Sequence, residues 1–424
     1  MVESFGEAVR RLRADRDGMS MRKLAKLAAV DPGHLSRIEA GRRPPTRQIA
    51  AALDHALCAA GTLAALAAEV PARPPPLAVD RWSRTDADTL AAALAAKTPT
   101  ADNALHLAHE WLVAEPPQTY ELRAGRHVGV PIVEQIEQRI HQLRLLDDHV
   151  GGLDTYDMVT GELDATVTML REAAYTEAVG RGLLGAIGEL CQLAGWVTAD
   201  AGRHSEAIRL YLTGVRAAHA AGDRPGAASN LSSLAYLVAN TGNPRQAVLM
   251  AASAVRGAEA HAAPAAQALL LERLAWTYAR AGAAADAERA LGRVEETFDD
   301  TRPDEEPAWT YWLDQDEITI MAGRCWTQLS RPLRAVPLLE DATSRYGQDT
   351  ARESALYLTW LAEAYLQANE IEPAAEVAIR ALMLAARAHS KRSTARVGEV
   401  REMLTPYHGV PAVDAFEDAF QASN

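Results

Sequence analysis

The chain has 424 residues, more than one compact domain usually holds, so two or three domains are expected. It is rich in alanine and poor in aromatic residues, which favours helices, and it has no run of about 18 uninterrupted apolar residues that would span a membrane. The formal net charge of −13 argues against nucleic-acid binding by the chain as a whole. The first residues lack the layout of a signal peptide and the three cysteines are far apart, so a soluble protein of the reducing cytoplasm is expected.

The positive charge is concentrated near the N-terminus. Residues 1–69 hold 11 Lys and Arg against 8 Asp and Glu, whereas the remaining residues hold 32 against 48. Within residues 19–49 the basic residues number 7 and the acidic residues 2. Because the rest of the chain repels phosphates, any contact with nucleic acid is expected from this N-terminal segment.

Residues 1–69 carry apolar residues at helical spacing, which predicts a small helical bundle. Its expected core consists of Phe5, Val9, Leu12, Leu35, Ile38, Ile49, Leu53, Leu57, Leu63 and Leu66. Within the bundle, Ser20 to Arg43 predicts two short helices joined by a tight turn. Ser20 is a good N-cap for the first helix. Asp31 caps the second, with Pro32 at the first helical position, where its missing N–H costs nothing.

This helix pair carries an ordered motif made of Leu24-Ala25, Val30-Asp31, Leu35-Ser36-Arg37-Ile38-Glu39 and Gly41. The motif resembles that of the phage-repressor-like (XRE) helix-turn-helix family, and the resemblance covers residues 4–68. Two positions depart from the family pattern. Met21 stands where the family often has a glutamine that contacts phosphate, and Ala29 replaces the turn glycine, so the turn must be accommodated differently or be strained.

The second helix of the pair is the expected DNA-reading element, because the N-terminal residues of a recognition helix reach base edges in the major groove. The expected base-contacting residues are Pro32, Gly33, His34 and Arg37, and those contacting phosphates are Ser36, Arg42, Arg43 and Arg47. Arg37 can donate bidentately to guanine, whereas a phosphate or solvent contact is equally plausible for His34. Glu39 is expected to brace an arginine. One such domain makes few contacts, so a dimer on a pseudo-palindromic operator is expected.

The next part of the chain divides into a proline-rich linker over residues 70–79 and a helical connecting region over residues 80–180. The linker contains VPARPPP, which favours extended polyproline geometry. Four possible metal ligands fall in the connecting region, His141, Asp147, Asp148 and His149. No H-E-x-x-H or similar spacing occurs, so a solvated helix end is the favoured interpretation, and neither a metal nor another cofactor is expected.

Residues 181–424 repeat a short signal, in which a small residue is followed five residues later by an alanine. The pairs are Gly202/Ala207, Gly242/Ala247, Gly282/Ala287, Ser330/Ala335 and Asn369/Ala374. Each unit predicts two helices joined by a tight turn, and such units stack into a solenoid. The pattern resembles tetratricopeptide repeats with longer helices, although unrelated helical hairpins remain an alternative. The expected fold is therefore all-α, with a helix-turn-helix bundle followed by a tetratricopeptide-like right-handed α-solenoid.

The order of the parts adds a second resemblance. After the N-terminal bundle and linker come Arg144, Asp147-Asp148 and Gly151-Gly152, and then Leu193-Ala194-Gly195-Trp196 at the start of the repeats. This order resembles the actinobacterial regulators that join a helix-turn-helix to tetratricopeptide repeats, and the use of four lysines against 39 arginines agrees with it. The resemblance implies a one-component transcriptional regulator whose repeats sense a peptide, small molecule or protein partner and support a homodimer.

The inner face of the solenoid is the expected effector groove, because the first helix of each unit lines it. Aligning the units on their alanines places Trp196, Tyr236, Trp276 and Arg324 at equivalent positions. Together with their neighbours on the same face, the groove residues are Gln192, Trp196, Asp200, Tyr236, Asn240, Glu272, Arg273, Trp276, Arg280, Arg324, Gln328, Trp360 and Glu363. Rings, amides and arginines suit a peptide or a small acidic ligand. The alternative, favoured for Trp196, is that the aromatic residues pack between helices.

Two other functions stay open at this point. The chain could be an interaction scaffold that captures a protein such as a sigma or anti-sigma factor, with only weak DNA contact, and Met21 in place of glutamine supports this alternative. A metal-dependent hydrolase would need its metal within residues 141–149. Because the sequence has neither a glycine-rich phosphate loop nor a nucleophile elbow, an enzyme is not expected.

Overall fold

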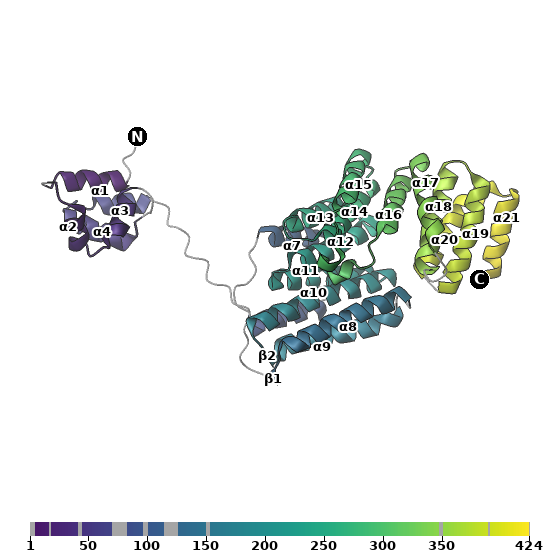
Figure 1. Cartoon of the computed structure of the whole chain (residues 1–424), viewed down its shortest axis with the longest axis horizontal. Helices are drawn as coiled ribbons and strands as arrows, with labels where there is room; N and C mark the ends of the chain where they lie inside the picture. The colour runs from purple at the N-terminus through teal and green to yellow at the C-terminus, as the bar shows by residue number, and fades with distance from the viewer. Residues whose placement is uncertain are drawn as a thin grey trace. The chain divides into compact units, whose positions relative to one another are not determined.

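The computed structural model describes residues 5–16, 18–40, 45–69, 83–95, 101–113, 126–149, 153–346, 351–388 and 391–423. The described chain is almost wholly helical and divides into two compact units, Met1–Asp80 and Arg81–Asn424 (Figure 1). A parallel pair of two-residue strands, β1 (Arg126–His127) and β2 (Ala173–Ala174), lies in the second unit. The structure therefore confirms an all-helical chain, while the linker expected at 70–79 lies outside the described residues.

The first unit is a bundle of five short helices around one apolar core. They are α1 (Phe5–Ala14), α2 (Met21–Leu27), α3 (Pro32–Glu39), α4 (Arg47–Leu57) and α5 (Thr62–Glu69). The side chains of Ser20 and Asp31 accept hydrogen bonds from the backbone N–H groups of Lys23 and His34, so both expected N-caps are present. Leu35 and Ile38 of α3 are fully buried against the other helices, which leaves the opposite face of α3 at the surface.

The turn between α2 and α3 depends on Ala29, which adopts a left-handed conformation with φ of 53°. The Val30 N–H donates to the carbonyl oxygen of Ala25 at 2.9 Å and closes the end of α2, while the Val30 side chain packs against the core. The turn thus has its usual geometry, but an L-residue occupies a position that glycine adopts more easily.

The second unit begins with α6 (Arg84–Ala95), α7 (Ala101–Val113), α8 (Val130–His149) and α9 (Leu153–Glu172). These helices pack directly on the repeats, with α8 and α9 against α10, and α7 against α11, α12 and α13. The Trp111 side chain of α7 is buried against Gly257, where an added Cβ would lie 2.1 Å from its ring. Helices α6 to α9 thus belong to the second compact unit together with the repeats.

Five helical hairpins follow, and each packs on the next (Figure 1). They are α10 (Glu177–Asp200) with α11 (His204–Ala221), α12 (Arg224–Thr241) with α13 (Pro244–Ala258), α14 (Pro264–Arg280) with α15 (Ala284–Phe298), α16 (Gln315–Gln328) with α17 (Pro332–Arg345), and α18 (Ala351–Gln367) with α19 (Ile371–Ala388). The described helices therefore form a helical solenoid.

The small-residue signal in the sequence marks these hairpins. All five marker alanines, Ala207, Ala247, Ala287, Ala335 and Ala374, have an exposed fraction of 0% and lie in the second helix of their hairpin. Four of the five turn residues have positive φ, namely Gly202, Gly282, Ser330 and Asn369. Gly242 is different, with φ of −139° before Pro244.

The long spacing between Ala287 and Ala335 has a structural cause. Between α15 and α16 the chain forms two 3₁₀ turns, η1 (Pro303–Glu305) and η2 (Ala308–Thr310), and buries Trp309. After α19, helices α20 (Lys391–Leu404) and α21 (Pro411–Ser423) pack on α18 and α19. Leu404, Val413 and Phe416 are buried there, so these helices extend the core of the solenoid.

One described helix, α10, is long and apolar enough to cross a membrane by length and composition alone. In the structure 67% of its most apolar window is buried inside the second unit. It is therefore accounted for as a core helix of the solenoid.

The conformation of Ala29 predicts that Ala29→Gly stabilises the first unit by about 0.5 to 1 kcal/mol. Glycine removes the steric cost of the left-handed conformation, and the larger loss of backbone entropy when glycine folds offsets part of this gain. Native-state hydrogen exchange of the amides in α2 and α3 of the full-length chain measures this change. The matched control is Ala28→Gly. Because Ala28 has a φ of −87°, glycine relieves no strain there, and this variant should lose about 1 kcal/mol of unfolding free energy. Equal loss of protection in both variants would contradict the prediction.

Candidate functional site

The first candidate site is the outer surface of α3. Pro32, Gly33, Ser36 and Arg37 are all exposed, and we call this surface the α3 face. A Cβ added to Gly33 would lie 3.8 Å from Nη1 of Arg37, so the guanidinium extends back over the first turn of α3. This first turn is the part of a recognition helix that contacts base edges.

His34 lies differently from its neighbours. Its side chain is half-buried, and its Nε2 is covered without a hydrogen-bond partner among the described residues. This ring nitrogen is therefore not available at the surface in this conformation. Of the four residues expected to contact bases, the other three are exposed.

The expected phosphate-contacting residues are only partly visible. Arg42 and Arg43 lie outside the described residues, and of Arg47 only the backbone, at the start of α4, is described. The structure adds three exposed cations on α2 that were not singled out in the sequence, Arg22, Lys23 and Lys26. Their signal was already present in the basic count of residues 19–49. Helix-turn-helix proteins use the first helix of the pair to contact the DNA backbone, and these cations suit that contact.

A half-buried ion pair fixes α3 against α1. Nε and Nη2 of Arg13 donate to the two carboxylate oxygens of Glu39 at 3.0 and 3.3 Å, and Nη1 donates to the carbonyl oxygen of Met19. Glu39 is buried, so the prediction that it braces an arginine is confirmed. A two-pronged pair of this kind sets the orientation of α3 more firmly than a single contact would.

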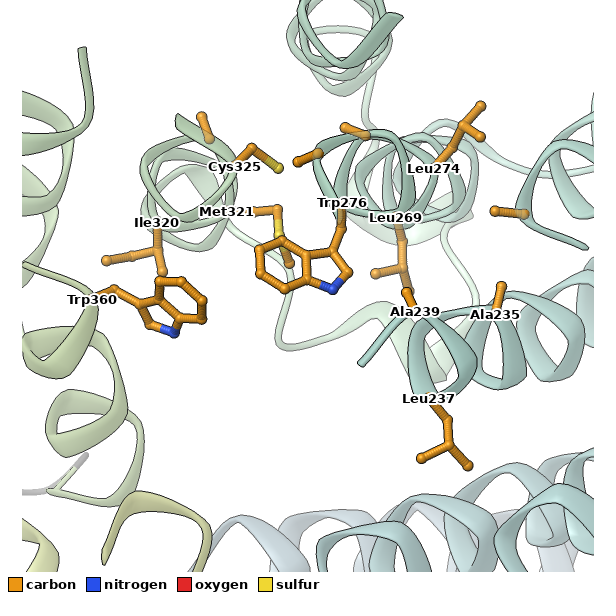
Figure 2. Close-up of a cluster of buried hydrophobic side chains, with 14 of the residues drawn as sticks. Ala235, Leu237, Ala239, Leu269, Leu274, Trp276, Ile320, Met321, Cys325 and Trp360 are labelled. Carbon is orange, nitrogen blue, oxygen red and sulfur yellow. The ribbon is translucent and has the colours of Figure 1, made fainter. Parts of the chain in front are cut away.

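The second candidate site lies on the first helices of the solenoid hairpins. The ring centroids of Trp196 and Tyr236 are 6.1 Å apart, as are those of Tyr236 and Trp276. Trp276 and Trp360 meet edge to face at 5.5 Å, and Figure 2 shows their side chains extending from α14 and α18. The three aromatic residues aligned in the sequence are therefore neighbours in space, and together with Trp360 they form a continuous row of rings.

Arginines are stacked along this row. The guanidinium carbon of Arg273 lies 5.3 Å from the Trp196 ring centroid and 5.5 Å from that of Tyr236. That of Arg324 lies 4.9 Å from the Trp276 centroid and 5.3 Å from that of Trp360. We call these rings and arginines, with Arg392 and Arg396 described below, the aromatic–arginine cluster. Cation–π attraction stabilises such stacks, most strongly where water is excluded.

Several of the polar groove residues are bonded to one another. Trp276 Nε1 donates to Asn240, and Arg280 Nη1 donates to Gln328 at 2.8 Å. Gln192 accepts from Arg144 and donates to Ser233. These amides link successive hairpins in the structure, and no ligand is needed to satisfy those bonds.

Two members of the cluster were missed by the sequence analysis, and both come from α20. Arg392 pairs with Asp200 of α10 at 3.3 Å and donates to the Tyr236 hydroxyl at 3.1 Å. Arg396 pairs with Glu363 and stacks on Trp360 at 4.0 Å. The marker signal did not include this helix, because Gly409 in the turn after it is followed five residues later by Asp414 and not by alanine.

Charge and burial act against each other within the cluster. Burial alone would raise the pKa of Tyr236, but the charges of Arg324 and Arg392 outweigh it and lower that pKa to about 8. Burial raises the pKa of Glu272 to about 8, in spite of the nearby Arg273. Glu272 is therefore mostly uncharged at neutral pH, so the arginines prevail in the local charge.

Three of the four residues considered as metal ligands have described contacts with other side chains. The side chain of Asp147 is buried and accepts from Thr155, and Asp148 accepts from the Tyr311 hydroxyl. His141 lies edge-on to the Tyr311 ring at 5.8 Å, and the side chain of His149 is outside the described set. Across the described ranges no three His, Cys, Asp or Glu side chains are placed to hold a metal ion together.

A cavity of about 500 Å³ lies beside this region. Most of its charged lining residues are acidic, among them Glu137, Glu189, Asp223 and Glu306, and Arg144 also lines it. Burial raises the pKa of both Glu189 and Asp223. The cavity is separate from the aromatic–arginine cluster and opposite to it in charge.

Comparison with known proteins identifies the first unit. Residues 4–67 match a family described as a helix-turn-helix domain, and no curated protein matches the chain. The chain thus carries a helix-turn-helix domain at its N-terminus, joined to a helical solenoid. Such a domain indicates DNA binding and a regulatory role.

The buried carboxyl of Glu272 generates a pH prediction. Its pKa of about 8 is above the ordinary value of 4.5, so the unfolded chain loses this proton at a lower pH than the folded chain. The stability that the protonated carboxyl contributes is complete below about pH 4.5 and is lost as pH rises towards 8. Relative to Glu272→Gln, the wild-type protein should therefore lose unfolding free energy between pH 6 and pH 8.

Urea unfolding of the full-length wild type and variant, followed by tryptophan fluorescence, measures this difference. Tyr236 is present in both proteins, so its own titration cancels. The exposed Glu259 provides a matched control as Glu259→Gln. A constant difference for Glu272→Gln would show that Glu272 ionises normally.

Proposed function

We propose that this protein is a one-component transcriptional regulator of the cytoplasm. The helix-turn-helix domain places α3 in the major groove of operator DNA, and the solenoid senses an effector and changes how the domain engages DNA. The observation that carries the proposal is the exposed α3 face on a domain whose core, caps and Arg13–Glu39 brace hold α3 in place.

The charge distribution supports the same function. The basic excess of residues 19–49 coincides with α2 and α3, and Arg22, Lys23 and Lys26 add exposed cations next to the α3 face. The acidic remainder of the chain disfavours non-specific contact with phosphates elsewhere. A single small domain buries little DNA surface, so we propose that a homodimer binds a pseudo-palindromic operator.

The solenoid supports the sensor role. Its hairpins resemble tetratricopeptide repeats in the order of their helices and in their small turn residues, and repeats of this kind provide extended inner surfaces for partners. The aromatic–arginine cluster gathers rings and guanidinium groups on the first helices of these hairpins, and it contains Trp196, Tyr236, Arg273 and Arg324. We propose that effector binding there changes the spacing or angle of the two DNA-binding domains.

Substitutions on the two helices should separate base reading from phosphate binding. Arg37→Ala should weaken binding to the preferred DNA sequence about tenfold or more and change binding to scrambled DNA little, because a bidentate base contact is lost. Arg22→Ala should weaken both DNAs alike and reduce the salt slope by about 1. Selection from a random DNA pool with the full-length protein defines the preferred sequence, and fluorescence anisotropy at several salt concentrations gives the affinities.

Arg256→Ala, an exposed arginine of α13, is the matched control and should leave both affinities unchanged. Identical behaviour of Arg37→Ala and Arg22→Ala on both DNAs would refute the assigned roles. If selection returned no preferred sequence while the protein co-purified with a stoichiometric partner, the scaffold function would replace the regulator.

A further inference from the structure

The aromatic–arginine cluster contains two buried cations that lack an acidic partner. Arg273 and Arg324 are each only 6% exposed. Nη1 of Arg273 and Nε of Arg324 have no hydrogen-bond partner, and neither guanidinium pairs with a carboxylate anywhere in the described chain. Buried charges are normally paired, because taking an ion out of water is costly.

The other two arginines of the cluster differ from Arg273 and Arg324, because each has a carboxylate partner. Arg392 pairs with Asp200, and Arg396 pairs with Glu363. Glu272 is next to Arg273 in sequence but does not neutralise it, since burial keeps the Glu272 carboxyl mostly protonated and its Oε2 also has no partner. The described cluster therefore carries more positive charge than its own acids balance.

The unpaired cations are not isolated from the surface. Arg273 lies over the Trp196 and Tyr236 rings, and both rings are partly exposed. Arg392 stacks on Trp196 at 5.6 Å, donates to the Tyr236 hydroxyl, and has a side chain that is 30% exposed. A small ligand that moves Arg392 aside would thus reach Arg273 between two aromatic faces.

We propose that this cluster binds an oxyanion, a carboxylate or phosphate group of a small ligand, with Arg273 and Arg324 as its charged donors and the Trp196 and Tyr236 rings as its walls. The guanidinium fork matches both kinds of oxyanion, and the flat rings suit a planar body attached to the anionic group. Identifying this ligand as the effector rests on the proposed function. Oxyanion binding itself does not depend on DNA.

The test uses the full-length protein without DNA and two probes, sodium phosphate and sodium citrate. Calorimetric titration gives the affinity, and thermal unfolding followed by tryptophan fluorescence gives the shift of the midpoint, with sodium chloride at equal ionic strength as reference. At least one probe should raise the midpoint of the wild type beyond the chloride reference. Arg273→Met and Arg324→Met should each weaken that binding at least tenfold.

A response to phosphate alone assigns a phosphate-bearing ligand, and a response to citrate alone assigns a carboxylate-bearing one. Arg256→Met is the matched control, because Arg256 is exposed on the same solenoid, and it should bind like wild type. Replacing either arginine by methionine leaves no carboxylate of the cluster without its ion-pair partner, so both cluster variants should fold.

Arg273→Lys provides a second variant of the same charge that lacks the guanidinium fork, and it should bind with intermediate affinity. The proposal is overturned if neither probe exceeds chloride, or if Arg273→Met and Arg324→Met bind like wild type. A protein that binds oxyanion but selects no DNA sequence would refute the proposed function and leave this site intact. Selective DNA binding without any oxyanion response would do the opposite.

Discussion

The close contact between the two helices of each hairpin is the constraint on which the second unit depends. In each of the five hairpins, a completely buried alanine lies near the start of the second helix, where a larger side chain would push the two helices apart. The first of these alanines is Ala207 and the last is Ala374. Because this contact recurs with nearly constant spacing, equivalent positions of successive first helices come into register. The rings of Trp196, Tyr236 and Trp276 are neighbours for that reason, and the arginines stack on a row that the backbone repeat has already built.

The interruption of the repeat is as informative as its regularity. The segment with η1 and η2 lengthens one spacing, and the hairpin after it places Arg324 where its predecessors place rings. The aromatic row passes over this hairpin from Trp276 to Trp360, and the Arg324 guanidinium lies against both. A cation thus occupies an aromatic position at the centre of the cluster. The charge of Arg324 helps to lower the pKa of Tyr236, whose hydroxyl accepts a hydrogen bond from Arg324.

Local signals in the sequence predicted the elements well, and distant contacts were beyond them. The caps at Ser20 and Asp31 and the turns marked by small residues depend on a few adjacent residues, so a pattern can reveal them. The contact of Arg392 with Asp200 joins residues far apart in the chain, and the local sequence around either residue gives no signal of it. The packing of α7 on the repeats was hidden in the same way. For the candidate sites, the sequence could place residues on a face, but the cover over His34 Nε2 and the missing partners of Arg273 appear only when neighbouring helices are in position.

The proposed functions require arginines that bind two kinds of anion, DNA phosphates and a small oxyanion. The degree to which each arginine is buried decides which of the two it can contact. A DNA duplex is rigid and wide, so it contacts only cations that project from a surface, as Arg22 and Arg37 do. Arg273 and Arg324 are also cationic, but rings and helices cover them within a part of the chain where acidic residues outnumber basic ones. Phosphates of a duplex are repelled by that exterior and are too large to enter, whereas the oxyanion ligand that we propose is small and would gain charge-assisted hydrogen bonds in a water-poor setting. The same protein can therefore use arginine for both purposes without the effector and the operator competing for one site.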